Sequence, residues 1–212
     1  MSEPARSTQA ERSERSKTAL LEAAADLIVE CGFPALTLAA IGERAGYSRG
    51  HVNFHFGSKD ALIDALIRRI VGRWSHRNVL PRTEGKPGLD GVVVILDAIR
   101  AQAERDPRAL RVLYSLVFEA VAPQDPLRAR FATFHATMRD DLAALIARGI
   151  EDGTIQADAD PELEAGLLVA ALRGIGYQWL LDPTRFDLVA HLDHLTTTTR
   201  ARLAGKQRRG KR

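Results

Sequence analysis

A short run of polar side chains at helical spacing is the part of the chain best suited to bind another molecule. Arg49, His51, Asn53 and His55 fall within one run of seven residues, and Lys59 follows shortly after. Arginine, asparagine and histidine side chains hydrogen-bond to base edges and phosphate oxygens, and lysine adds a positive charge for phosphate. This combination of residues predicts a surface that binds nucleic acid.

Patterns typical of catalysis or metal binding are sparse. Of the six histidines, only the pairs His51 with His55 and His191 with His194 have helical spacing, and a metal site would need a further ligand. The chain has no glycine-rich phosphate loop and no Gly-x-Ser-x-Gly turn. The single cysteine, Cys31, excludes an internal disulfide and a cysteine zinc cluster, and we expect it to be buried. We therefore expect no catalytic residue, no metal and no cofactor, and an enzyme is unsupported.

Two short helices and a tight turn position the polar run. Leu38, Ile41 and Ala45 have helical spacing up to Gly46, whose freedom to adopt a positive φ ends the first helix. Ser48 can cap the second helix by accepting hydrogen bonds from its free amides. The pattern predicts a helix-turn-helix.

The second helix turns Val52 and Phe56 inward and leaves its polar side chains outside. Eight or so residues at about 1.5 Å each make a rod roughly 12 Å long, which fits a DNA major groove about 12 Å wide. Polar outer faces also occur on helix-turn-helix subdomains that bind no DNA, so spacing alone leaves both interpretations open.

The run from residue 41 to residue 62 resembles the N-terminal domain of the tetracycline-repressor (TetR) family of bacterial transcription regulators. The resemblance is carried by Gly46-Tyr47-Ser48 at the turn and by Phe54-His55-Phe56-Gly57-Ser58-Lys59 after it. It covers about the first third of the chain closely, and the remainder only in length and helical layout. Two positions depart from the family pattern: His51 replaces a frequent Thr, and Asn53 replaces a usual Tyr.

The resemblance implies a role for each matching residue. Arg49 and His51 should lie near base edges, and Asn53, His55 and Lys59 near phosphates, while the two departures should alter base preference. The full set of expected DNA-contacting residues is Thr37, Tyr47, Ser48, Arg49, Gly50, His51, Asn53, Phe54, His55 and Lys59.

Apolar periodicity predicts helices throughout the chain, and no stretch has the sustained alternation of a strand. We expect an all-α protein in which a three-helix head is joined by a connector helix to a larger helical body. The expected helices outside the helix-turn-helix span residues 14–31, 59–77, 89–104, 127–151, 161–181 and 185–203, with one more starting at residue 107 and a loop over residues 80–88.

Large side chains on the inward faces of several body helices suggest a ligand cavity, although such residues are more often only core. The resemblance favours a cavity for a small, apolar effector. The expected lining residues are Trp74, Leu96, Tyr114, Phe118, Phe134, Met138, Arg173 and Trp179, with Tyr114, His135 or Arg173 as polar anchors.

The segment of residues 161–181 is apolar on nearly all sides and contains small residues such as Ala170 and Gly174. A helix that is apolar on two sides must be covered on two sides. We expect it to pair, together with the last helix, with a second copy as a four-helix bundle; a helix buried within a monomer is the alternative.

Composition sets broad limits. The 212 residues carry a net charge of +3, but the last seven contribute five positive charges, which leaves −2 for the rest of the chain. No apolar run approaches the eighteen or so residues of a membrane span, and the charged N-terminus does not look like a secretory signal. We expect a cytoplasmic protein that does not enter the membrane.

The predicted domains are a disordered arm (residues 1–13), the DNA-binding head (14–58), the effector-binding and dimerisation body (59–203) and a basic tail (204–212). With the resemblance, these domains indicate a homodimeric regulator that binds double-stranded operator DNA, most simply a repressor released by a small molecule. A transcriptional activator, or a helical small-molecule-binding protein or enzyme whose head no longer reads DNA, is the alternative.

Overall fold

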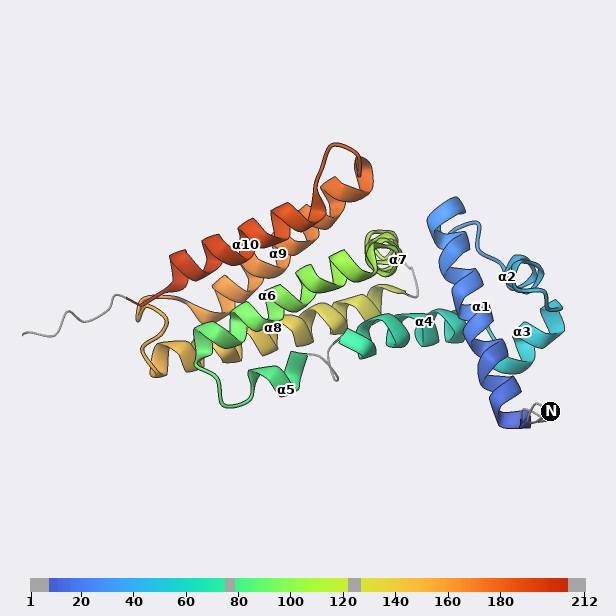
Figure 1. The fold of residues 1–212 in the computed structure, drawn as a ribbon, viewed down its shortest axis with the longest axis horizontal. Helices are drawn as coiled ribbons and strands as arrows, with labels where there is room; N and C mark the ends of the chain where they lie inside the picture. Colours follow the sequence, from blue (N-terminus) through green and yellow to red (C-terminus); the bar gives the residue numbers. More distant parts are fainter. Residues whose placement is uncertain (1–7, 75–78, 122–126, 206–212) are drawn as a thin grey trace, which may run out of the picture. The chain divides into compact units, whose positions relative to one another are not determined.

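The structure, a computed structural model, describes residues 8–74, 79–121 and 127–205, except for the side chains of residues 73, 74 and 80. These residues form ten helices (Figure 1) and no strand, apart from a single bridge between Ile155 and Ala204. The predicted all-α class is confirmed. No helix among the described residues has both the length and the apolar content needed to cross a bilayer.

The chain folds into two compact units, residues 1–70 and residues 71–212. We expected the boundary at residue 58, before the helix α4 (Lys59–Trp74). The structure divides the chain within α4 because Leu62, Ile63 and Leu66 are buried, at 0%, 0% and 3% exposure, on the part of the helix that belongs to the first unit.

The first unit contains α1 (Gln9–Cys31), α2 (Leu38–Ala45), α3 (Arg49–Phe56) and the first part of α4. Helix α1 begins five residues earlier than predicted, so residues 9–13 of the expected disordered arm are helical. The reason is a capping box: Glu11 N donates to Thr8 Oγ1 (3.2 Å), and Thr8 N donates to Glu11 Oε2 (2.9 Å). The rest of the arm, residues 1–7, lies outside the described residues.

The core of the first unit is formed by the apolar stripes of its helices. Leu20 and Ala24 of α1, Ile41 of α2 and Val52 of α3 are each 0% exposed. The prediction that Cys31 is buried was wrong, because this last residue of α1 is exposed.

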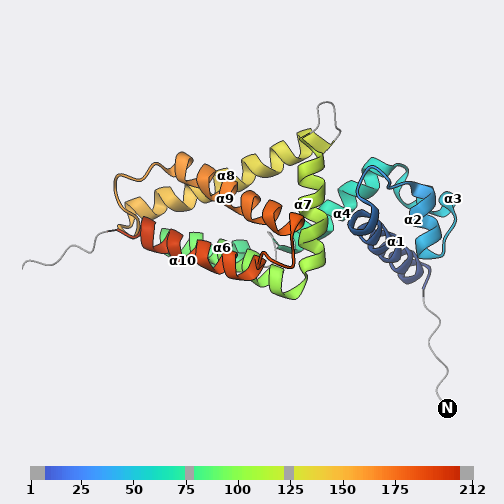
Figure 2. The same ribbon diagram turned by 90° about the horizontal axis from the view of Figure 1, so that it is seen from above.

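The second unit is a helical bundle (Figure 2). Helix α6 packs beside α8 and α10, α8 packs beside α9, and α7 contacts both α8 and α9. Its helices are α5 (Leu80–Thr83), α6 (Gly88–Arg105), α7 (Pro107–Glu119), α8 (Leu127–Glu151), α9 (Pro161–Leu181) and α10 (Leu188–Leu203).

Three details of the body differ from the predictions. The expected loop over residues 80–88 contains the short helix α5. This helix accommodates Pro81 because the N–H groups of the first helical turn have no partner within the helix. Helix α4 is described as far as Trp74, and the predicted end at residue 77 lies outside the described residues. Helix α10 begins at Leu188, three residues late, because Asp187 accepts from Ala190 N (3.0 Å) and caps it there. The first two residues of the predicted tail bond to the body, because Ala204 N donates to Arg200 O (3.1 Å) and Gly205 N donates to Thr154 O (2.9 Å); residues 206–212 lie outside the described residues.

Candidate nucleic-acid interface and effector site

The turn between α2 and α3 has the caps that its sequence predicts. Thr37 Oγ1 accepts from Ala40 N (3.1 Å) at the start of α2, and Gly46 adopts the left-handed conformation (φ 76°) at its end. Ser48 Oγ then accepts from His51 N (3.1 Å) and starts α3. These local bonds fix the direction in which α3 leaves the turn.

One face of α3 is open. Arg49, Gly50, Asn53 and Phe54 are all exposed. Phe54 is 82% exposed, which is unusual for a large aromatic side chain. Because Val52 on the opposite face is fully buried, α3 is a rod anchored on one side with a polar and aromatic surface on the other.

The histidines of α3 face partly inward. His51 stacks on the Tyr47 ring, with centroids 4.5 Å apart and planes at 6°. His55 Nε2 lies 3.2 Å from His51 Nε2 and 2.9 Å from Ser16 Oγ on α1. Burial lowers the pKa of His55, and the nearby His51 and Lys17 lower it further. The Nε2 atom of His55 therefore supports α3 against α1, and the expected contact of His55 with a phosphate stays a prediction.

Lys59 also has partners within the head. Its Nζ donates to Phe33 O (3.1 Å) and lies 4.1 Å from the centroid of the Phe33 ring. Lys59 thus contacts the link between α1 and α2, and its expected contact with a phosphate stays a prediction. Sequence reasoning missed Ser16, which is 5% exposed; its signal was a hydroxyl on the inward stripe of α1.

In the second unit, Arg173 of α9 forms the centre of a cluster between three helices. Its Nε donates to His135 Nε2 of α8 (2.9 Å), and its Nη2 donates to Met138 Sδ (3.5 Å). The guanidinium carbon lies 5.4 Å from the Tyr114 ring of α7 and 5.8 Å from the Phe134 ring. Five of the residues expected around an effector are therefore neighbours, and we call these five the Arg173 cluster.

Tyr114 forms the floor of the Arg173 cluster. It is 1% exposed, its hydroxyl donates to Leu172 O (3.2 Å), and burial raises its pKa. A Cβ at Gly176 would lie 2.4 Å from the Tyr114 ring, so only glycine lets α9 approach this closely. Phe118, also predicted, stacks at 6.3 Å from Tyr114 and continues the aromatic surface toward Tyr177.

His135 is a neutral acceptor in this cluster. Burial, with Arg173 and Arg139 nearby, lowers its pKa from 6.5 to about 4. A neutral imidazole can accept the hydrogen bond that Arg173 Nε donates. The positive charge in the cluster is therefore that of Arg173.

With this geometry in view, two sequence comparisons identify the family. Residues 20–66 match the bacterial regulatory proteins of the tetR family, and residues 90–204, more than half of the chain, match the C-terminal region of BetI-type transcriptional repressors. The chain belongs to the TetR family of bacterial transcriptional regulators. The predicted class of function, a ligand-responsive DNA-binding repressor, is confirmed at this level.

Among TetR relatives, the chain is 37% identical to the HTH-type transcriptional regulator BetI of Burkholderia lata over 78 residues, 35% of this chain and only 40% of the relative. Its fold is similar to that of SmeT, the repressor of the Stenotrophomonas maltophilia multidrug efflux pump SmeDEF (TM-score 0.76, 21% identity, 93% of this chain and 94% of SmeT). SmeT has also been solved as a complex with triclosan. A regulator from Saccharomonospora viridis in complex with choline has the same TM-score of 0.76 at 20% identity, covering 91% of this chain and 100% of the other.

Three residues that we expected around the effector of this TetR protein are not part of the Arg173 cluster. Trp179 is 7% exposed and lies under Arg111, whose guanidinium carbon is 5.0 Å from its ring. Leu96 is buried in α6, at 2% exposure. The side chain of Trp74 lies outside the described residues.

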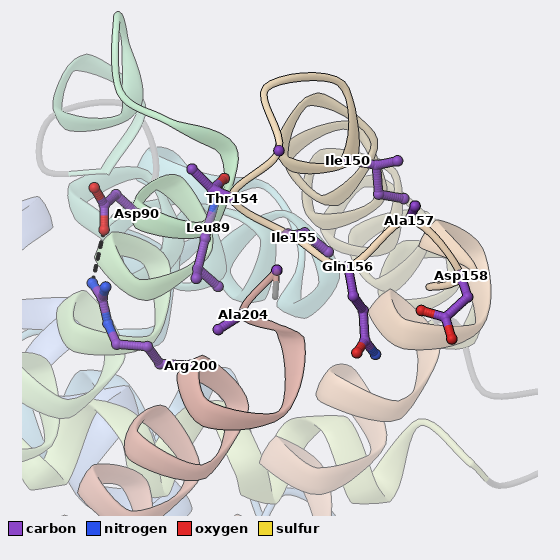
Figure 3. Close-up of a pocket in the computed structure, with 12 residues that line it drawn as sticks. Leu89, Asp90, Ile150, Thr154, Ile155, Gln156, Ala157, Asp158, Arg200 and Ala204 are labelled. Atoms are coloured by element: carbon purple, nitrogen blue, oxygen red, sulfur yellow. Dashed lines mark hydrogen bonds and ion pairs between the residues drawn. The ribbon is translucent and has the colours of Figure 1, made fainter. Parts of the chain in front are cut away.

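The second unit of the TetR fold also contains a hollow that the sequence did not indicate (Figure 3). Its volume is about 870 Å³, and it lies where the first turn of α6, the link between α8 and α9 and the end of α10 meet. An ion pair between Arg200 and Asp90 (2.8 Å) borders it. The hollow shares no residue with the Arg173 cluster.

Proposed function

We propose that this TetR-family repressor works in the cytoplasm as a homodimer that binds a near-palindromic operator. In each subunit the exposed face of α3 would enter a major groove, with Arg49 near base edges and Asn53 near phosphate. The observation that supports this most directly is the anchored helix α3, which has Arg49, Gly50, Asn53 and Phe54 open on one side. Two-fold symmetry would place the two half-sites about one helical turn apart, roughly 34–36 Å.

The exposed surface of α9 supports the dimer. Leu163, Leu167 and Leu181 are 61%, 52% and 63% exposed, and Tyr177 is 46% exposed. With Ala170 and Gly174 they follow one another at three- or four-residue steps, and so form one stripe along the helix. Burying such a stripe against a second copy would remove a continuous apolar surface from water.

The last helix contributes to the same interface in this proposal. Helix α10 follows α9 after a short turn and packs against it. Its exposed residues include small or short side chains at steps of seven and four residues, which keep them on one side of the helix, namely Ala190, Thr197 and Ala201. Two helices from each subunit would then form the four-helix bundle that we expected from the sequence.

Effector binding would reach the DNA through α4. This helix is continuous across the two units, because its residues up to Ile70 belong to the first and the remainder to the second. A ligand that favours one position of α4 would change the spacing of the two heads. A coupling of about 1–3 kcal/mol, typical of allostery, would change operator affinity about 5- to 150-fold.

Repression is favoured over activation because the match over residues 90–204 is to repressors of the BetI type. The effector is a separate question. The similar proteins SmeT and the S. viridis regulator hold triclosan and choline, a neutral or weakly acidic phenol and a cation, so the shared fold does not specify one ligand.

The test is selection of bound sequences from a random DNA pool by the purified protein. We expect an enriched inverted repeat, bound by two subunits, and affinity that falls with salt as phosphate contacts release counterions. Arg49→Ala should relax the preference at one base position in each half-site. Binding that is sequence-blind, or selection of a single half-site by a monomer, would refute the proposal.

A further inference from the structure

Arg173 carries a positive charge that the described residues do not balance. Its hydrogen-bond partners are all neutral, namely the His135 imidazole, the Met138 thioether and the Tyr114 hydroxyl, and the rings of Tyr114 and Phe134 lie close to it. None of the ion pairs among the described residues involves Arg173. Burial lowers its pKa, although Tyr114 partly offsets the effect. Arg173 is half-buried, and a charge that is partly removed from water without a counter-charge costs free energy, which a bound anion would offset.

The surroundings of Arg173 disfavour a cation. A quaternary ammonium ligand needs open aromatic faces, but the guanidinium already lies over the rings of Tyr114 and Phe134. The other charged group felt by His135 is Arg139, which is also positive. The field in the Arg173 cluster therefore favours a negative group.

The donors of Arg173 suit a carboxylate. The Nε atom is held by His135, which fixes the plane of the guanidinium. The Nη2 atom donates to the Met138 sulfur, a weak acceptor that a carboxylate oxygen can displace. An oxygen pair approaching the two Nη atoms would form the bidentate contact for which arginine is well shaped. The flexible Met138 can then turn aside to make room.

We infer that the effector of this protein is a small organic acid, whose carboxylate pairs with Arg173 and whose apolar body lies against the aromatic rings of Phe118 and Phe134. The inference rests on the proposed function, because it gives the ligand class of the proposed effector site. It also states what is excluded: a quaternary ammonium compound should not bind in the Arg173 cluster.

Calorimetric titration of the full-length protein with matched acids and amides tests the inference. The probes are benzoate and benzamide, 2-naphthoate and 2-naphthamide, and octanoate and octanamide, with benzyltrimethylammonium as the cationic probe. In at least one pair we expect the acid to bind ten-fold or more tightly than its amide. If every pair binds equally or not at all, or if the ammonium probe binds most tightly, the inference is wrong.

Substitutions of Arg173 test whether the preference for the acid over its amide depends on this residue. Arg173→Met should abolish the acid preference and, because it removes an unbalanced charge, should raise the melting temperature of the ligand-free protein. Arg173→Lys keeps the charge without the planar fork, so some preference for the acid should remain. The matched control is Arg111→Met, which removes an arginine lying over another aromatic ring, that of Trp179, in the same unit. A preference that survives in Arg173→Met would overturn the assignment.

Operator binding is measured separately, on the selected DNA and without any acid. Acid binding without sequence-specific DNA binding would support the anion site and refute the proposed operator binding. Sequence-specific DNA binding without any acid preference would support the proposed operator binding and refute the anion site.

Discussion

Phe54 combines an exposed aromatic ring with a place on the open face of α3, and this makes it a candidate for reading a base. In the major groove, thymine differs from the other bases by its C5-methyl group, which makes apolar contacts with protein side chains. The Phe54 ring lies 5.3 Å from the ring of His55 but is still 82% exposed, so most of its surface is open to such a contact.

We therefore expect Phe54→Ser to weaken operator binding at thymine positions. Replacing each operator thymine by uracil removes only the methyl group, and at the contacted position the wild type should lose about 4-fold in affinity, as for one buried methylene at about 0.8 kcal/mol. Phe54→Ser should bind both DNAs equally when measured by fluorescence anisotropy. Val121→Ser, which alters another exposed apolar residue (71%), is the control. An equal uracil penalty in Phe54→Ser and the wild type would exclude the contact.

His135 makes stability depend on pH. Its pKa is about 4 in the folded protein against an ordinary value of 6.5, so between these pH values the unfolded chain binds a proton that the folded chain does not. Stability therefore falls as the pH is lowered from about 6.5 toward 4, and His135 has no effect above that window. Melting temperatures of His135→Gln should fall less than those of the wild type across this range. His191→Gln, which alters an exposed histidine of α10, should follow the wild type; parallel curves for all three proteins would show that His135 does not titrate as described.

At the scale of elements, the packing of α2 against α3 depends on Gly42. A Cβ there would lie 2.7 Å from Tyr47 O, 3.1 Å from the carbonyl carbon of Ser48 and 3.1 Å from Val52 Cγ2. Two of these atoms are backbone of the turn itself, which cannot move aside without changing the direction of α3.

Gly42→Ala should destabilise the protein by about 1–3 kcal/mol, the usual cost of overpacking, and should weaken operator binding because α3 is displaced. Urea unfolding followed by circular dichroism measures the first effect and anisotropy the second. Gly50→Ala is the control for stability, because the nearest atom to its Cβ would be Ser48 Oγ at 3.7 Å. A Gly42→Ala protein as stable as Gly50→Ala would show that the turn is softer than its geometry indicates.

At the scale of the whole molecule, the proposed dimer depends on the exposed stripe of α9. Leu167→Glu would place a charge in the middle of that stripe, where a second copy should bury it at high cost. We expect a monomer in analytical ultracentrifugation and at least a ten-fold loss of operator affinity, because a monomer holds a single half-site. Val121→Glu, an equal change on an exposed residue of the second unit, should remain dimeric. A dimeric Leu167→Glu protein would place the interface on another surface.

Most of the helices could be predicted from the sequence, because a helix depends on signals from residues that are close together in the chain. Apolar periodicity marked α8 and α9 from end to end, and caps at Ser48 and Asp160 act within three residues of themselves. The errors were local too: the capping box at Thr8 and the tolerance of Pro81 for a first helical turn were present in the sequence but were not recognised.

What only the tertiary structure decided is which side chains meet. His55 and Ser16 are 39 residues apart, and Arg173 and His135 are 38 apart, so no spacing rule connects them. Residue type indicated that His55 and Lys59 are polar surface groups, but it did not indicate the contacts that both side chains make within the head. The same holds in the second unit, where the sequence indicated an apolar cavity, and the packing of α7, α8 and α9 gathered its aromatic rings around one unbalanced positive charge. Local chemistry determines where a helix begins and ends, whereas the partner of a side chain depends on which helices the whole chain brings together.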